Sequence, residues 1–161
     1  MVPRLLGCYL PGVFDRGDED FVKVKLIEGD FVETLWAVRV GDGRFELRNV
    51  PMYAYRVSEG DVVEGVEYAP GMYEFIRVVQ PSGNRVIRVI LAADAKADTD
   101  AGKAVIAGLK ALGITYENFD SSWIGVTVPP DVELPRVVEY LIGTGLRWEY
   151  ASPTYEDLFP S

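Results

Sequence analysis

Residues 33–63 read ETLWAVRVGDGRFELRNVPMYAYRVSEGDVV. Apolar and aromatic residues alternate with charged ones in this stretch, and Gly or Pro interrupts each run. Such alternation is typical of short antiparallel strands that have one face in solvent. The stretch therefore predicts a β-rich unit, but it contains no pattern that specifies a chemistry.

The sequence Gly41-Asp42-Gly43 predicts a tight hairpin, because Asp-Gly suits two-residue turns. We expect four facing pairs: Val40 with Phe45, Val38 with Leu47, Trp36 with Asn49 and Arg39 with Glu46. A register two residues tighter would oppose Arg39 to Arg44, which is unfavourable. The hairpin thus predicts one apolar and one charged face.

Further short strands are expected on both sides of this hairpin. The predicted strands are Phe21–Ile27, the period-two run Tyr53, Tyr55 and Val57, then Val62–Tyr68 and Met72–Val79. Five or six strands with tight connections are enough to roll into a small barrel. Residues 21–81 are therefore predicted to form a small antiparallel β-barrel-like unit, or meander.

The pattern changes at Arg85. A nearly continuous apolar strand (85–91) precedes a helix capped by Thr99 (100–112), two strands (114–119 and 123–128), a helix after Pro130 and a last strand (146–150). In the second helix, Leu134, Val137, Val138, Leu141 and Ile142 form an apolar stripe. The order β-α-β-β-α-β predicts a ferredoxin-like plait over residues 82–152.

The expected fold class is α+β, with the barrel-like unit packed on the plait. Residues 1–20 are interpreted as an N-terminal arm and 153–161 as a C-terminal tail, whose Tyr155, Leu158 and Phe159 are expected to fold back onto the body. The boundary near 80–84 is short, and Met72–Val79 could pair with Arg85–Leu91 across it. We therefore expect two rigidly joined subdomains.

Composition limits the classes of function. The chain has 161 residues, 48% of them apolar, and no apolar run approaches the ~18 residues of a membrane span. We expect a soluble, cytoplasmic protein with no membrane partner. The formal net charge of −9 repels phosphate backbones, so no nucleic-acid partner is expected.

Histidine is absent and Cys8 is the only cysteine. Zinc sites built on these ligands and nucleophile–histidine catalysis are therefore excluded. Gly41-x-Gly43 lacks the spacing and the following Lys-Ser/Thr of a phosphate loop, and the acidic residues around Asp61 and Asp94 do not match a calcium loop. We expect no cofactor and no metal, and no catalytic residue is identified.

Four motifs carry a family resemblance. They are Glu33–Ala37 (ETLWA), Asn49–Ala54 (NVPMYA), Gly60–Val63 (GDVV) and Ser82–Arg88 (SGNRVIR). Together with the two-helix half, residues 21–150 resemble small bacterial proteins grouped as a domain of unknown function, DUF4265. The resemblance implies one inherited fold and no established activity. Asn84 stands where many relatives are expected to have histidine, which argues against a histidine-based site.

The candidate binding residues are Glu33, Trp36, Asn49, Tyr53 and Asp61. The acidic, tyrosine-rich sequence favours a non-catalytic interaction protein, such as an immunity-type protein that neutralises a basic partner. Two alternatives stay open: a small-ligand-binding regulatory domain, and a hydrolase-type enzyme that uses Glu33, Asp61 and Tyr53. The sequence leaves a homodimer open as well.

Overall fold

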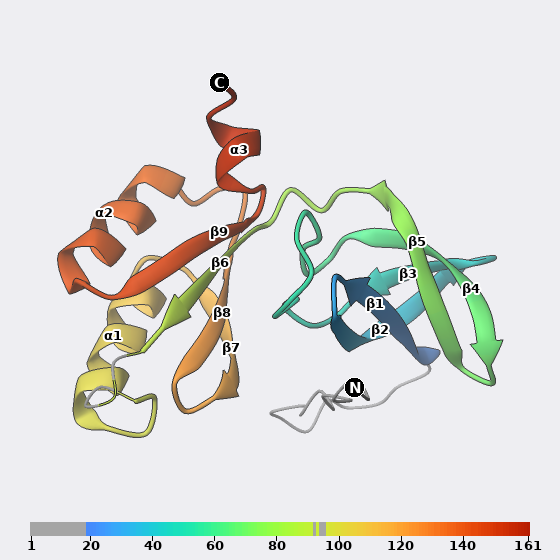
Figure 1. Ribbon diagram of the computed structural model, residues 1–161, viewed down its shortest axis with the longest axis horizontal. Helices are drawn as coiled ribbons and strands as arrows, with labels where there is room; N and C mark the ends of the chain where they lie inside the picture. Colours follow the sequence, from blue (N-terminus) through green and yellow to red (C-terminus); the bar gives the residue numbers. More distant parts are fainter. Residues whose placement is uncertain (1–18, 92, 94–95) are drawn as a thin grey trace.

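The computed structural model describes residues 19–91, 93 and 96–161, and it is a mixed α+β structure made mostly of strands. Figure 1 shows two units side by side, a β-barrel and a four-stranded sheet with helices. The predicted arm falls almost wholly in residues 1–18, which lie outside the described residues.

Five strands close the barrel in the order β1-β2-β3-β4-β5. They are β1 (Phe21–Glu28), β2 (Phe31–Gly41), β3 (Arg44–Leu47), β4 (Val62–Ala69) and β5 (Met72–Gln80). Neighbours in the chain pair antiparallel, and β1 pairs with β5 in parallel through Lys23–Met72 to Lys25–Glu74, which closes the ring. The barrel-like prediction is confirmed.

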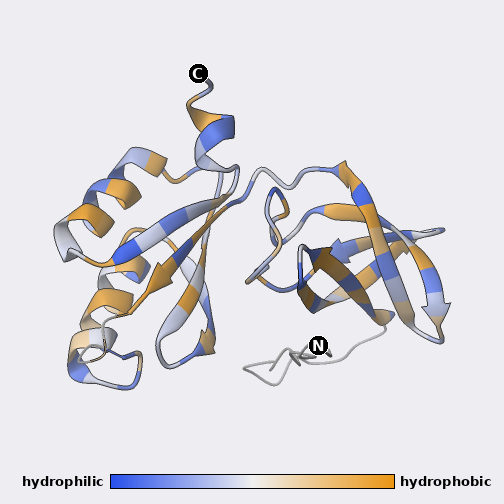
Figure 2. Cartoon of the chain, in the orientation of Figure 1, coloured by the Kyte–Doolittle hydropathy of each residue, from blue (hydrophilic) through white to orange (hydrophobic). Residues whose placement is uncertain are grey.

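Apolar side chains from the strands fill the interior of the barrel. Val24 and Leu35 from β1 and β2 are fully buried, as are Phe45 and Leu47 from β3. In β1 and β3 the intervening residues include Lys23, Lys25 and Glu46, which are charged, and the barrel strands carry both hydrophobic and hydrophilic segments in Figure 2. Closure leaves few unpaired strand edges in a unit this small.

The predicted hairpin register is wrong by one residue beyond the turn. Gly41 faces Arg44 as expected, but a bulge at Val40 places Arg39 opposite Phe45 and Val38 opposite Glu46. Val40 is half exposed, whereas Ala37 and Leu47 face each other in the core. The bulge bends β2 while the apolar side chains of β2 and β3 stay inside the barrel. A prediction that assumes strict alternation cannot locate such a bulge.

Residues 48–61 are a loop between β3 and β4, so the expected strand at Tyr53, Tyr55 and Val57 is wrong. Val57 is buried and the two tyrosines are half-buried, while Met52 and Ala54, which precede them, are buried as well. This loop, called the bridging loop below, packs between the two units.

The second unit contains β6 (Arg85–Ile90), α1 (Asp100–Ala111), β7 (Thr115–Asp120), β8 (Trp123–Val128), α2 (Leu134–Thr144) and β9 (Arg147–Ser152). The sheet order is β7-β8-β6-β9, and all neighbours are antiparallel. The predicted hairpin between β5 and β6 is wrong, because the two strands belong to different sheets.

Capping and turn residues mark the start of α1 and both ends of α2. Thr99 caps α1 by accepting a hydrogen bond from the Gly102 N–H, as predicted. In α2, Pro135 occupies the first turn and Gly145 ends the helix in the left-handed conformation, with φ of 70°. Ile142, expected in the apolar stripe, is instead 65% exposed.

Both faces of the sheet are covered. The helices cover one face through Leu109 and Leu141, which pack on Ile87, Val89 and Ile124. The bridging loop covers the other face, where Val50 and Met52 form a separate apolar cluster with Val86 and Ala151. The barrel therefore joins the sheet through a packed interface, which we call the seam.

The C-terminal residues form a short helix, α3 (Tyr155–Leu158), after a cis Ser152–Pro153 bond. Thr154 and Asp157 make a reciprocal capping box. The rings of Tyr155 and Phe159 each lie 6.3 Å from Tyr150 of β9. The tail thus folds back onto the sheet edge.

Candidate functional site

Glu33 lies in the seam and is only 5% exposed. Its carboxylate accepts hydrogen bonds from the backbone N–H groups of Met52, Tyr53 and Ala54. Burial raises the pKa of Glu33, while these three N–H groups and the Arg88 charge oppose the rise. A single carboxylate from the barrel therefore fixes the conformation of the bridging loop.

Asn49 is 1% exposed and connects the two units. Its side-chain oxygen accepts the Trp36 N–H at 2.9 Å, and its amide donates to both oxygens of Glu117 on β7 at 3.3 Å. Burial raises the pKa of Glu117 to about 7, and the nearby charges of Glu59 and Glu33 add to the rise. Glu117 was not predicted, because only the tertiary fold brings it to Asn49.

Asp61 is the last residue of the bridging loop, and its carboxylate lies in the same seam. Its carboxylate accepts from the Ser58 N–H at 2.8 Å and from the Ser82 N–H at 2.7 Å. Close by, Glu59 accepts from the Thr127 hydroxyl of β8 at 2.9 Å, and the Glu59 carbonyl accepts from the Asn84 amide at 2.8 Å. These bonds hold the linker between β5 and β6 against the bridging loop.

Two of the predicted residues are aromatic. Tyr53 stacks on Phe31 with ring centroids 4.7 Å apart and meets Trp123 of β8 edge-on at 5.2 Å. Trp36 is half-buried, with the Lys23 ammonium 4.8 Å from its ring centroid. Both rings therefore make contacts within the chain.

Four of the five predicted binding residues, Glu33, Asn49, Tyr53 and Asp61, thus gather at the seam, and Trp36 adjoins it through Asn49. None of the five lines either of the two hollows described below. Each makes contacts that join elements of this chain. A role for them in binding another molecule stays a prediction.

A different surface has the shape of a binding site. A groove of about 670 Å³ runs along β9 between α2, α3 and the bridging loop, and we call it the β9 groove. It is lined by Tyr55, Arg56, Val138, Ile142, Trp148, Glu149, Tyr150, Thr154, Tyr155, Glu156 and Phe159. Sequence reasoning did not assign a site here; the alternation of Trp148 and Tyr150 and the aromatic tail were its available signals.

One wall of the β9 groove is aromatic. Trp148 and Tyr150 meet edge-on at 5.1 Å, and Tyr155 and Phe159 lie 4.9 Å apart. Tyr155, Phe159 and Ile142 are 59%, 55% and 65% exposed, respectively. Such a group of exposed apolar side chains on one small surface marks an interaction site more often than isolated exposed residues do.

The other wall carries a charged network. Glu149 accepts hydrogen bonds from the Tyr55 hydroxyl and from Arg88, both at 3.2 Å. Arg88 is 3% exposed; its guanidinium lies 4.5 Å from the Tyr55 ring centroid and donates to the Ala54 carbonyl. Burial and the Glu149 charge raise the pKa of Tyr55, which keeps its hydroxyl a donor. Arg88 thereby orients a carboxylate at the groove.

Arg56 holds the groove together at one end. Its backbone has φ of 60°, unusual for a residue other than glycine, and its N–H donates to the Ala151 carbonyl at 2.9 Å. Its side chain donates to Asp157 of α3 at 3.1 Å. The bridging loop, β9 and α3 are therefore joined by one residue.

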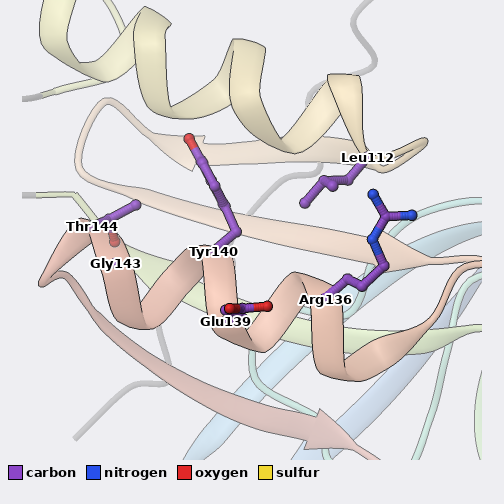
Figure 3. Close-up of a pocket in the computed structure, with 6 residues that line it drawn as sticks. All are labelled: Leu112, Arg136, Glu139, Tyr140, Gly143 and Thr144. Atoms are coloured by element: carbon purple, nitrogen blue, oxygen red, sulfur yellow. The ribbon is translucent and has the colours of Figure 1, made fainter.

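A second hollow, of about 480 Å³, lies between α1 and α2 (Figure 3). Tyr140 points toward α1, where its hydroxyl donates to the Val105 carbonyl at 2.9 Å; Arg136 extends toward Leu112, and Glu139 points away from both. Their polar groups do not converge. The hollow therefore lacks the arrangement that a small polar ligand needs.

Two other features are absent from the described residues. They contain no group of three or more His, Cys, Asp or Glu side chains placed to hold a metal. No described helix has the length and apolar content needed to cross a membrane.

The comparisons with known proteins agree on fold and family. A solved structure, a hypothetical protein from Neisseria gonorrhoeae, is 18% identical with a TM-score of 0.68, and the match covers 84% of this chain and 96% of that one. At this identity the similarity supports the fold alone. No curated protein matches the chain. The family described as "Domain of unknown function (DUF4265)" matches residues 33–149, and the chain belongs to this family.

Proposed function

We propose that this protein is a non-catalytic interaction protein that holds a basic, partly apolar segment of a partner protein in the β9 groove. The groove itself carries the proposal: its lining combines five aromatic rings with the carboxylates of Glu149 and Glu156. Aromatic faces and carboxylates both attract Lys and Arg side chains, and aliphatic stems pack well on aromatic rings.

The charges of the molecule support a basic partner. The chain has a net charge of −9, which accelerates association with a cationic protein and disfavours an anionic one. Arg56, a cation at the groove, is already paired with Asp157. An immunity-type protein that neutralises a basic partner in the cytoplasm fits this surface.

The proposed architecture is consistent with this function. We infer that the second unit is a ferredoxin-like plait, supported by its element order β-α-β-β-α-β and its fully antiparallel sheet. Its strand β9 lies at one edge of the sheet, next to the groove. The barrel then serves as a rigid support for the bridging loop, which supplies Tyr55 and Arg56.

The test uses two synthetic peptides of about eight residues, enough to span a strand. One alternates Lys with Val and the other alternates Glu with Val. We expect the Lys peptide to bind at least about tenfold more tightly in calorimetric titrations, with the difference shrinking as salt is added. Equal affinity of the two peptides would refute the proposal.

Variants locate the binding surface. Ile142→Ala, and Tyr155→Ala combined with Phe159→Ala, remove exposed apolar side chains of the groove. Val66→Ala and Ile76→Ala are matched controls, since they remove exposed apolar side chains of the barrel. The groove variants should bind the Lys peptide several-fold more weakly than the natural protein does, and the controls should bind it equally well. The reverse result would show that the peptide binds outside the β9 groove.

A further inference from the structure

Strand β9 is an outer strand of its sheet. It pairs with β6, and no other strand in the described part of the chain pairs with its second edge. At one end this edge is engaged, because Ala151 accepts from the Arg56 N–H and bridges to Thr154. The open part of the edge is therefore Arg147–Tyr150. Open edges present backbone N–H and C=O groups that pair readily with another strand.

The β9 groove lies at this edge. Successive side chains of a strand point to opposite faces of the sheet. Trp148 and Tyr150 pack with the helices, whereas Glu149 lies on the other face with Arg88 and Tyr55. Nevertheless, all three residues from 148 to 150 line the same groove. Consecutive strand residues can line one hollow only where that hollow extends around the strand edge.

We infer that the partner segment binds as an added β-strand along Arg147–Tyr150, with its alternate side chains on the two walls of the groove. This inference rests on the proposed function and specifies its binding mode. One set of side chains would lie against Trp148, Tyr150 and the exposed Ile142, and should be apolar. The other set would lie over Glu149 and the Tyr55 ring, and should be Lys or Arg.

The occupant is an extended segment of a basic protein rather than a second copy of this chain. Two copies would each bring a net charge of −9 to the contact, and their mutual repulsion opposes pairing. A basic strand instead meets Glu149 and Glu156 at the groove. The alternation of basic and apolar side chains is thus the expected feature of the partner.

Backbone methylation tests the binding mode. The alternating Lys-Val peptide is made in two forms, N-methylated on every Lys or on every Val, which removes alternate backbone donors but keeps the side chains. An added strand presents the N–H groups of only one set to β9. We expect one form to lose about tenfold or more in affinity and the other to lose less than about threefold.

Amide hydrogen exchange provides the second measurement. Binding of the unmethylated peptide should slow exchange within residues 147–150 and leave the interior strand β8 unchanged. If both methylated forms bind like the parent, or both weaken equally, the added-strand mode is wrong while the groove and the proposed function stand. If Lys and Glu peptides bind alike, the proposed function itself fails. A dimer through β9 in sedimentation experiments would also overturn the inference.

Discussion

Two buried carboxylates stabilise the seam through hydrogen bonds from backbone N–H groups. Glu33 and Asp61 are almost fully buried, and their oxygens are used by backbone N–H groups of the bridging loop and the linker. A buried carboxylate with such partners is worth more than a surface ion pair, because its replacement leaves several donors unsatisfied. The sequence predicted both residues as binding residues, a role that stays a prediction, and the structure gives each a partner within the chain.

Replacing Glu33 by Gln tests this arrangement. The amide retains one acceptor oxygen and places an NH2 donor against backbone N–H groups that are themselves donors. We expect a loss of about 2 kcal/mol in the free energy of unfolding, measured by urea denaturation. Glu74→Gln, which breaks an exposed pair with Lys25, should change stability by less than about 0.5 kcal/mol. Equal effects would show that Glu33 does not support the loop.

Glu117 makes stability depend on pH. Its pKa of about 7 in the folded protein exceeds the ordinary value of 4.5, so the folded state binds the proton more tightly than the unfolded chain. Stability from this group is fully present below pH 4.5 and is lost as the pH rises toward about 7. The Glu117→Gln variant should therefore lose this decline, and should be more stable than the natural protein by about 1–3 kcal/mol at pH 8.

The measurement is a series of urea denaturations between pH 5 and pH 8. Glu139→Gln is the matched control, since it removes one exposed carboxyl from α2. The control should keep the pH dependence of the natural protein. A Glu117→Gln variant with an unchanged slope would contradict the assignment.

Helices and strands with strong local signals were predicted from sequence within one or two residues at most ends. The strand Trp123–Val128 and the Thr99 cap are examples, because alternation and capping depend on neighbouring residues alone. The bridging loop shows the opposite case. Its apolar and aromatic residues pack between two units instead of pairing with a strand, and local sequence cannot distinguish the two.

The α1 cap gives a test at this scale. Thr99→Ala removes the acceptor for the Gly102 N–H and should cost about 1 kcal/mol of stability, with faster amide exchange in the first turn of α1. Thr99→Ser keeps the hydroxyl and is the matched control, expected to lie within a few tenths of a kcal/mol of the natural protein. A serine variant as unstable as the alanine variant would show that the methyl group, rather than the cap, matters.

At the scale of the whole molecule, close packing at the seam joins barrel and sheet. Gly125 of β8 shows how close the packing is: a Cβ added there would lie 2.7 Å from the Val50 side chain and 3.0 Å from the Met52 sulfur. Apolar contact of this kind, together with the Asn49–Glu117 bonds, joins the two units that lie side by side in Figure 1. The orientation of the β9 groove depends on this docking, since Tyr55 and Arg56 come from the bridging loop.

Gly125→Ala should therefore push the bridging loop away from the sheet. We expect a loss of about 1–3 kcal/mol of stability by urea denaturation, and weaker binding of the Lys-Val peptide because Tyr55 moves. Gly143→Ala in α2 is the control, since nothing lies within 4 Å of its added Cβ. It should stabilise the protein by about 0.5–1 kcal/mol. A Gly125→Ala variant of natural stability would show that the seam is loosely packed.

The sequence by itself determined the α+β class, the barrel-like first unit, the order of elements in the second, and the family. The first three follow from periodicity, capping and turn residues, which act over a few neighbouring positions, whereas the family follows from the resemblance of four sequence motifs. Only the tertiary structure decided that the predicted polar residues meet at a seam and that a groove forms along β9. Both depend on contacts between residues far apart in the chain, such as Asn49 with Glu117 and Tyr55 with Glu149, and no local pattern encodes such a pairing.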